Sequence, residues 1–520
     1  MFFKRRYFYF YLLLVVLLLG GCNSDDASSS SGEGNKEPQS GGTLNIAYPT
    51  QPQTLDPHET TAEATRDAAK VIYEALVTLD ENYEVIPQLA ESYEQNDDGS
   101  VITINLRKDI KFHNGETMDA DDVIASMNKW GTKMPELGEH EWISVDENTV
   151  ELHLSEPSSL TMYFLADISR IAAIMPKEIA KSAGATGVTE YIGTGPFKFV
   201  EWKQDEVIKY EKFDEYQTVT APASGLGGKK EALVDAINWN FVPDSSTRVN
   251  GLMSGQYDFA HMINYDSIPQ LENSNGVVVD VWSYGIEALI FNKKEGLFSD
   301  IKARQAVNYA LDMEEIMGAA FVSSDYYELD SALFLPSQAT WYSETGKENY
   351  NQKNINKAKD LLKEAGYNGQ EIVILTSRDY EHHYNAAVAT QQELQKLGMN
   401  VKLDVYDWPT LLERRDNPSN YDIFFTGFST TTTPNQYVFL NSETEWAGWT
   451  NSPELDQLLE KIKNADENEI EKLNNELHQE LWEYLPVINL GKNSRVSGYA
   501  EKLNGFTNFL GPNFWNVTKN

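Results

Sequence analysis

The feature that most restricts the fold is an alternation between strand-like and helix-like segments along the chain. The clearest case begins with EIVILTS (371–377), an apolar run typical of a buried strand. NAAVATQQELQKLG (385–398) follows with the spacing of an amphipathic helix, and NVKLDVYDW (400–408) is again strand-like. Strand, helix and strand in this order predict a βαβ unit. We therefore expect a mixed α/β architecture.

Further segments follow the same alternation. Strands are expected at 41–49, 98–112 and 149–154, and helices at 64–76, 119–130, 301–317 and 355–367. In GTGPFKF (193–199), Gly193 and Gly195 are expected to adopt backbone conformations denied to other residues at the entry to a strand.

Composition indicates a folded and strongly acidic protein. The chain holds 42 Lys and Arg against 79 Asp and Glu, a net charge of −37, with 41% hydrophobic residues. Such a charge repels nucleic acid and anionic lipid headgroups, so no nucleic-acid partner is expected. The roughly 480 residues after residue 40 are enough for about three domains or lobes.

Cys22 is the single cysteine of the chain, which excludes an internal disulfide and a zinc site of several thiolates. Three basic residues (4–6), an apolar run (7–19) and two glycines precede it, the order of a secretory signal. The sequence LGGC resembles the lipobox of bacterial lipoproteins. This resemblance implies a signal peptide at 1–21, a diacylated Cys22 anchored to the cell membrane, and a flexible tether at 22–40. An ordinary signal with an incidental cysteine is the alternative.

Signatures of catalysis are missing from the sequence. It contains no G-x-S-x-G and no H-E-x-x-H, and GLGGKK (225–230) lacks the glycine spacing of a phosphate loop. Glu381-His382-His383 could contribute a metal ligand, but adjacent histidines point in different directions and an exposed polar loop is the favoured interpretation. We expect no enzyme activity, no metal and no cofactor.

Long segments closely resemble the oligopeptide, dipeptide and nickel binding family of ABC-transporter substrate-binding proteins, solute-binding protein family 5. The first runs from TLDPHETTAEATRDAAKVIYEAL to DADDVIASM; others are YIGTGPFKFVEWKQDEVI, GLMSGQYDFA, FNKKEGLFSDIKARQAVNYALDMEEI and GWTNSPELDQLLEKI. The resemblance implies a two-lobed periplasmic-binding-protein-like α/β fold (type II) with an additional inserted lobe. By this analogy lobe I comprises 41–75, 191–284 and 489–520, lobe II is the insertion 76–190, and lobe III is 285–488.

The same resemblance implies a function and partners. The chain would be an extracytoplasmic, monomeric lipoprotein that binds an oligopeptide or peptide-like solute between its lobes. It would deliver the solute to ABC permease subunits driven by a separate ATPase. Three alternatives remain open: a binder of an oligosaccharide or other neutral solute, a binder of a nickel chelate, and a solute sensor without transport.

The resemblance also implies where the ligand lies. In the family it contacts the segment after a G-W or G-F dipeptide, here 425–441, where peptide binders carry an aspartate for the ligand's α-ammonium. This chain has no Asp or Glu from Gly427 to Leu440. Glu59 and Glu63 are candidate substitutes, and Thr61 is a candidate contact. From the segment itself the candidates are Phe428, Ser429, Thr430, Thr431, Thr432 and Thr433.

Aromatic and basic residues complete the candidate site. Trp408 and Arg415 match, in type and spacing, a tryptophan and an arginine that line the family's cleft. Trp446 and Trp449 flank the threonine segment, with core packing beneath a loop as the alternative. Trp282 and Tyr284 lie at the expected crossover between lobes. Aromatic faces with hydroxyl groups suit sugars, capped peptides and other amphipathic solutes.

Overall fold

The computed structural model describes residues 40–96, 99–465 and 467–520. The predicted signal peptide, Cys22 and all of the predicted tether except Ser40 lie outside the described residues. Contacts divide the chain into Met1–Glu37 and Pro38–Asn520. Everything below concerns the second unit, here called the body, which contains every described strand pairing and both hydrophobic clusters.

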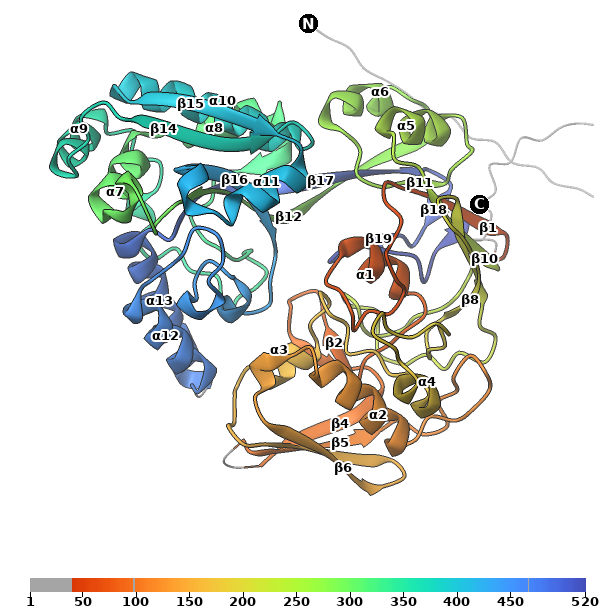
Figure 1. Cartoon of the computed structure of the whole chain (residues 1–520). Helices are drawn as coiled ribbons and strands as arrows, with labels where there is room; N and C mark the ends of the chain where they lie inside the picture. Colours follow the sequence, from red (N-terminus) through yellow and green to blue (C-terminus); the bar gives the residue numbers. More distant parts are fainter. Residues whose placement is uncertain (1–39, 97–98, 466) are drawn as a thin grey trace, which may run out of the picture. The chain divides into compact units, whose positions relative to one another are not determined.

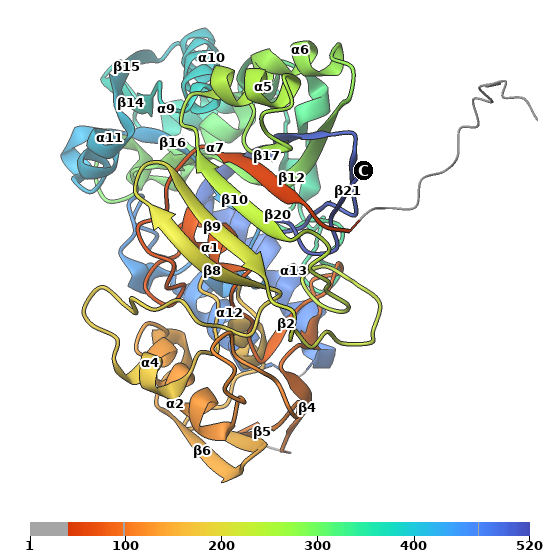
Figure 2. The same cartoon turned by 90° about the vertical axis from the view of Figure 1, so that its right-hand side faces the viewer.

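One mixed sheet of eleven strands runs through the described part of the body (Figures 1 and 2). Its path is β15 (Asn400–Tyr406), β14 (Glu371–Ser377), β16 (Ile423–Ser429), β12 (Val277–Phe291), β17 (Val487–Ala500), β11 (Phe259–Ala260), β1 (Thr43–Tyr48), β10 (Ala236–Phe241), β9 (Val207–Lys212) and β8 (Phe197–Lys203), with β13 (Tyr327–Glu328) beside β17.

Two long strands join the halves of this sheet. β12 and β17 pair antiparallel from Val277 opposite Ala500 to Ile290 opposite Val487. The first half of β12 lies on the side of β11 and β1, whereas its second half pairs with β16. The register of β12 shifts between Ser283 and Gly285, where the chain passes from one half to the other. This passage places residues 282–284 between the two halves.

The predicted βαβ unit is confirmed. β14 and β15 pair in parallel, and α10 (Glu381–Leu397) connects them. Gly398 ends α10 with φ +98°, a left-handed conformation that glycine adopts without a steric penalty. The predicted strands at 41–49, 98–112 and 149–154 also form, within narrower limits at the first two positions.

The insertion carries a four-stranded antiparallel sheet, drawn orange in Figure 1. Its order is β4 (Ala90–Gln95), β5 (Val101–Leu106), β7 (Thr149–Leu154) and β6 (His140–Asp146). α2 (Ala120–Gly131) begins with a capping box, in which Asp119 accepts from the Asp122 backbone and Asp122 accepts in return. The alternating burial predicted for β5 is confirmed, since Ile102, Ile104 and Leu106 are buried.

The other helices surround the two sheets. They are α1 (Glu63–Ala69), α3 (Thr161–Leu165), α4 (Lys177–Lys181), α5 (Ser245–Met253), α6 (Ile268–Glu272), α7 (Ile301–Ala310), α8 (Met313–Phe321), α9 (Ile355–Glu364), α11 (Trp408–Arg415), α12 (Pro453–Lys463) and α13 (Glu467–Tyr484). Short two-stranded pairs are β2 (Val77–Leu79) with β3 (Val85–Pro87), β18 (Leu503–Asn504) with β21 (Thr518–Lys519), and β19 (Thr507–Asn508) with β20 (Pro512–Asn513).

Two sequence predictions need correction. The helix expected at 301–317 is split into α7 and α8, because Leu311 is extended and Asp312 caps α8. The helix expected at 64–76 ends at Ala69. Beyond it the Ile72 carbonyl accepts a hydrogen bond from the Gly195 backbone at 2.8 Å.

The two glycines of GTGPFKF therefore act differently from the prediction. Neither Gly193 nor Gly195 has a positive φ. Instead, a Cβ atom at Gly193 would lie 2.2 Å from the Ile72 oxygen, and one at Gly195 would lie 2.7 Å from it. Glycine is required because two backbone segments approach closely. The strand predicted after them is confirmed as β8.

No helix among the described residues is long and apolar enough to cross a membrane.

Candidate functional site

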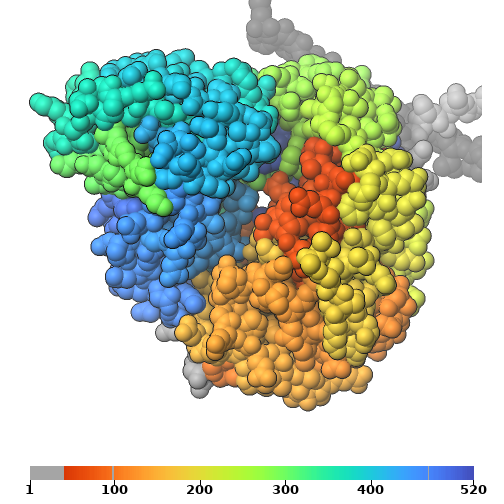
Figure 3. Space-filling view, in the orientation of Figure 1, coloured from red at the N-terminus to blue at the C-terminus, as the bar shows by residue number. Residues whose placement is uncertain are grey.

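Two pockets share a residue of their walls, and Figure 3 shows a hollow between the red and blue segments on one face of the molecule. The first, of about 500 Å³, is called the threonine pocket because Thr430, Thr431 and Thr432 line it. The second, of about 600 Å³, is called the histidine pocket because His382 and His383 line it. Tyr284 on β12 lines both.

The threonine pocket is assembled from segments that are far apart in sequence. Residues before and within α1, three stretches of the insertion, the crossover on β12 and the end of β16 all contribute. The predicted site residues in its wall are Thr61, Trp282, Tyr284, Phe428, Ser429, Thr430, Thr431 and Thr432. Their roles as ligand contacts remain predictions.

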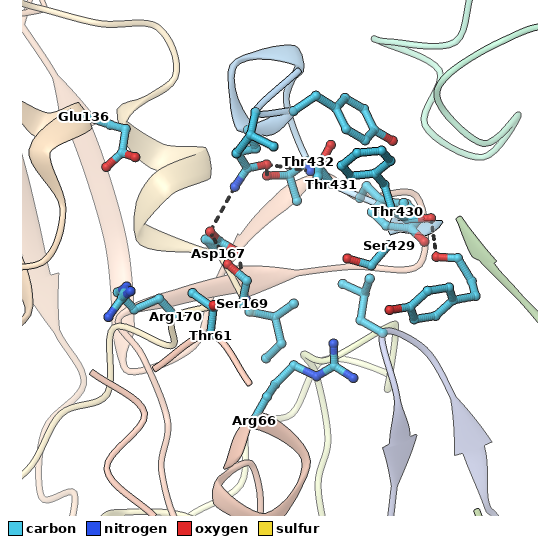
Figure 4. A pocket seen from close by; sticks show the side chains of 18 of the residues that line it. Thr61, Arg66, Glu136, Asp167, Ser169, Arg170, Ser429, Thr430, Thr431 and Thr432 are labelled. Carbon is cyan, nitrogen blue, oxygen red and sulfur yellow. Dashed lines mark hydrogen bonds between the residues drawn. The ribbon is translucent and has the colours of Figure 1, made fainter. Parts of the chain in front are cut away.

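The threonine segment is held by its own hydrogen bonds (Figure 4). Thr430 donates from its backbone and its hydroxyl to the Tyr284 carbonyl, at 2.8 and 3.1 Å. The Gln436 Oε1 atom accepts from the Thr432 backbone and hydroxyl, both at 2.8 Å, and from the Thr433 backbone at 3.0 Å. These bonds fix the loop and occupy hydroxyl groups that the sequence offers as ligand donors.

Asp167 connects the insertion to this loop. Gln436 on η7 (Pro434–Gln436) donates from Nε2 to Asp167 Oδ2 at 2.9 Å, and the Ser169 backbone and hydroxyl each donate at 2.8 Å (Figure 4). Burial raises the pKa of Asp167, whereas these hydrogen bonds oppose the rise. Asp167 and the exposed Glu136 are the acidic residues among those that line the threonine pocket.

Three basic residues line the same pocket: Arg66, Lys133 and Arg170. The Arg66 Nε atom lies 2.8 Å from Asp67, and Arg170 donates to the His58 carbonyl at 2.5 Å. Lys133 lies 2.9 Å from Glu59. The pocket thus presents charges of both signs beside the aromatic rings of Trp282, Tyr284 and Phe428.

The two glutamates proposed as substitutes for the peptide-specific aspartate are already paired with cations. Glu59 contacts Lys129 at 3.2 Å and Lys133 at 2.9 Å. Glu63 lies 3.7 Å from Arg495, whose guanidinium lies 3.7 Å from the centre of the Tyr284 ring. Neither glutamate is among the residues that line the threonine pocket.

Trp408 lies in the wall of the histidine pocket rather than in the threonine pocket. Its backbone N–H donates to Asp379 at 2.7 Å, and its ring centre lies 4.8 Å from that of Tyr380 and 5.8 Å from that of His383. This aromatic group forms one wall of the pocket.

The sequence favoured an exposed polar loop for His382 and His383, and this prediction is wrong. Both belong to the first turn of α10, and His383 is buried. Adjacent residues of a helix are about 100° apart, and the two rings meet with their centres 4.2 Å apart. Burial, together with His383 and Arg495, lowers the pKa of His382 well below its ordinary value.

Besides Glu59 and Glu63, four predicted residues line neither pocket. Thr433 is fully buried and begins η7. The Arg415 guanidinium lies 5.3 Å from the centre of the Trp446 ring, and Trp446 packs 5.5 Å from Phe428. Trp449 stacks on Tyr421 at 6.2 Å. Trp446 therefore packs against Phe428 and Arg415, and Trp449 packs against Tyr421.

Sequence reasoning missed Asp167, Gln436 and the basic residues of the pocket. Asp167 lies in the insertion, more than 250 residues before the loop it contacts, and no local pattern marks it. The Thr433-to-Gln436 spacing was the one available signal, since Thr-x-x-Gln is the pattern of a capping box, which forms here.

Comparison with known proteins gives a family match. Residues 84–449 match the family described as bacterial extracellular solute-binding proteins, family 5, middle region.

Two relatives and one solved structure illustrate the similarity. The chain is 29% identical over 495 residues to the probable peptide ABC transporter periplasmic-binding protein y4tO of Sinorhizobium fredii, covering 89% of this chain and 91% of the relative. It is 27% identical over 517 residues to the oligopeptide-binding protein AppA of Bacillus subtilis, covering 93% and 92%. The structure of AgaA from A. tumefaciens R10 in complex with agropinic acid matches with a TM-score of 0.75 and 27% identity, covering 92% and 99%. The predicted two-lobed binding-protein fold is thereby confirmed.

Proposed function

Because the chain belongs to the bacterial extracellular solute-binding proteins of family 5, we propose that it captures an oligopeptide or peptide-like solute in the threonine pocket. It then delivers the solute to the permease subunits of an ABC importer with a separate ATPase. No covalent step is required, because lobe closure excludes water and strengthens each hydrogen bond to the solute. The relatives named as peptide and oligopeptide binders support this solute class.

The observation that carries the proposal is the mixed lining of the threonine pocket. Asp167 and Glu136 supply negative charge, Arg170 supplies a positive charge with no carboxylate partner among the described residues, and aromatic rings supply apolar surface. A peptide has an ammonium group, a carboxylate and apolar side chains, and each finds a complementary group there. The wall contains residues from each of the three predicted lobes, so closing these lobes would surround the ligand.

Asp167 is our candidate for the residue that receives the ligand's α-ammonium. It takes the place of the aspartate missing from 427–440, but it comes from the insertion and is hydrogen-bonded to that segment through Gln436 (Figure 4). Glu59 and Glu63 are less suitable because Lys129, Lys133 and Arg495 already neutralise them. The half-buried Asp167 has no cationic partner among the described residues.

A neutral solute such as an oligosaccharide is the second candidate. The rings of Trp282 and Tyr284 on the pocket wall support it, since aromatic faces stack on sugar rings. The hydroxyl bonds of Thr430 to the Tyr284 carbonyl and of Thr432 to Gln436 weigh against it, because these hydroxyls are already engaged as donors.

Thermal unfolding of the body with a panel of solutes tests the proposal. The panel holds free-amino peptides, the same peptides N-acetylated, and oligosaccharides. A ligand at a hundred times its dissociation constant adds ~2.7 kcal/mol to the free energy of unfolding. We expect stabilisation by free-amino peptides and less by the acetylated set. Stabilisation by oligosaccharides alone, or by no member of the panel, would contradict the peptide proposal.

We also propose that Cys22 is acylated and anchors the chain to the cell membrane. The order of basic residues, apolar run, glycines and cysteine supports this reading. Mass spectrometry of the membrane-extracted protein should find a diacylated Cys22 as the first residue. An unmodified cysteine in a released protein would favour the ordinary signal peptide.

A further inference from the structure

The histidine pocket contains a group of potential metal ligands that the proposed function does not use. Glu287 on β12 and His382 and His383 on α10 each offer one ligand atom, and these atoms lie within 4.8 Å of one another. The two histidines line the pocket, and Glu287 lies fully buried behind them. These three residues are called the His–Glu cluster.

The local structure explains how the cluster is assembled. Glu287 pairs with Gly427 across β12 and β16, and a Cβ atom at Gly427 would lie 3.6 Å from Glu287 Oε2. The missing side chain leaves that space beside the carboxylate. From the other side, α10 begins at Glu381 and directs its first turn at Glu287, so that His383 Nδ1 lies 2.5 Å from Glu287 Oε1.

The buried carboxylate has no permanent cation as a partner among the described residues. Its contacts are His383 and the Asn493 amide, whose Nδ2 lies 3.4 Å from Oε2. Arg495 lines the same pocket, but its guanidinium is directed to Glu63 and the Tyr284 ring. A buried carboxylate is costly unless a positive charge compensates it. A bound cation would supply that charge.

Two further groups in this wall lack partners. His382 makes no hydrogen bond to any residue that the structure describes, although its ring packs 5.5 Å from Phe321. The Asn493 side chain is 5% exposed and lines the pocket, and its buried Oδ1 accepts no hydrogen bond within the described part of the chain. Both are atoms with free lone pairs, the property that a metal ion requires of its ligands.

We propose that Glu287, His382 and His383 bind a zinc-like divalent ion, with the Asn493 carbonyl oxygen as an adjacent acceptor. Two imidazoles and one carboxylate suit Zn²⁺, whereas Ca²⁺ and Mg²⁺ prefer oxygen ligands throughout. Three protein ligands leave a coordination position open towards the histidine pocket, where water or a donor group of a solute completes the shell. This inference goes beyond solute capture and does not depend on it.

Calorimetric titration of Zn²⁺ into the chelator-treated body tests the site. We expect one ion per chain, and an affinity at least ~10-fold weaker in His382→Ala and in Glu287→Gln. Co²⁺ gives a second readout, because coordination by imidazole nitrogen produces visible absorption bands that these variants should lose. Asn493→Ala should weaken binding by a similar or smaller factor.

His153→Ala is the matched control. His153 and Glu151 form another His–carboxylate pair, at 2.7 Å, on the insertion sheet, but they belong to no group of three potential metal ligands among the described residues. This variant should bind Zn²⁺ like the wild type. The absence of binding, or binding that His382→Ala leaves unchanged, would overturn the proposal.

Folding and solute capture are checked separately. Glu287 is fully buried, so Glu287→Gln is checked by circular dichroism; the half-buried His382 makes no hydrogen bond that its removal would break and serves as the decisive variant. Peptide stabilisation is measured with a chelator present. Peptide binding without zinc binding contradicts the metal site alone, and zinc binding without peptide binding contradicts the solute proposal alone.

Discussion

At the scale of single residues, the proposed role of Asp167 predicts that its substitution affects the binding of free-amino peptides more than that of N-acetylated peptides. We expect Asp167→Asn to weaken the binding of free-amino peptides by roughly 10- to 100-fold, because a charged hydrogen bond to the ammonium is lost. Binding of N-acetylated peptides should change less, since they carry no ammonium, although the single asparagine oxygen keeps only part of the hydrogen bonds that Asp167 accepts from Gln436 and Ser169. Calorimetric titration of the paired peptides measures both effects.

Glu136→Gln is the control for this comparison. Glu136 lines the same pocket but is exposed and makes no hydrogen bond within the described residues. An equal loss of affinity for free-amino peptides in both variants would show that binding depends on the total negative charge of the pocket wall and not on contact with Asp167.

The burial of His478 leads to a second prediction at this scale, which concerns how the free energy of unfolding depends on pH. His478 is 2% exposed on α13, with Nδ1 2.9 Å from the Asn474 carbonyl and Nε2 without a partner among the described residues. Burial lowers its pKa from 6.5 to about 4. The unfolded chain therefore binds the proton first, so the free energy of unfolding decreases as pH falls from 6.5 towards 4.

We expect His478→Gln to remove this part of the acid sensitivity. Relative to pH 7, the wild type should lose about 3 kcal/mol more than the variant at pH 4. Denaturant unfolding at several pH values measures the difference. Parallel curves for wild type and variant would show that His478 does not titrate in this range.

The candidate site could be predicted only in part from sequence, for a physical reason. Residues consecutive with a strand end, such as Phe428 to Thr432, reach the pocket because β16 carries them there. Trp446 and Trp449 come after turns, and their side chains pack against Phe428 and Tyr421. The spacing of residues along the sequence does not specify these contacts. Asp167 reaches the pocket through tertiary contacts alone.

At the scale of elements, local periodicity was most informative where one face of an element is buried. β5 and β14 follow their predicted patterns because alternate or continuous burial selects their side chains. The break between α7 and α8 was missed because the apolar spacing continues across it. There the Asp312 side chain accepts from the backbones of Glu314 and Glu315, at 3.1 and 3.2 Å, and a capping bond outweighs continued helix.

Asp312→Ala should therefore destabilise the body by about 1 kcal/mol, the usual loss for a removed N-cap. Asp312→Asn should retain most of the stability, because asparagine caps as well as aspartate does. Lys353→Ala removes the exposed ion pair at 2.9 Å and should change little. Denaturant unfolding compares the three. A loss in Asp312→Asn as large as in Asp312→Ala would assign the effect to charge instead of capping.

At the scale of the whole body, hydrogen bonds between the insertion and α12 lie outside the threonine pocket but connect the segments that form its walls. The Ser158 hydroxyl donates to the Lys463 carbonyl at 3.1 Å, and the Ser159 hydroxyl donates to the Ile462 carbonyl at 3.1 Å. With the Gln436-to-Asp167 bond, these contacts join the segments predicted to form lobes II and III. They favour an arrangement in which both walls of the threonine pocket are close together.

The Ser158→Ala/Ser159→Ala double variant tests whether this arrangement is the one that binds solute. Each hydroxyl bond contributes about 1 kcal/mol, so their loss should shift the population towards separated lobes. Since apparent affinity falls with the population of the competent state, peptide binding should weaken by ~5-fold or more, although neither serine lines the pocket.

Small-angle scattering of the unliganded variant should show a larger radius of gyration, and saturating peptide should restore the wild-type value. Ser155→Ala is the control, because its hydroxyl donates to Glu139 within the insertion, at 2.8 Å. If the double variant binds peptide as tightly as the wild type, these bonds are equally present in the open and the closed states. Closure would then depend on the ligand and the β12–β17 crossover alone.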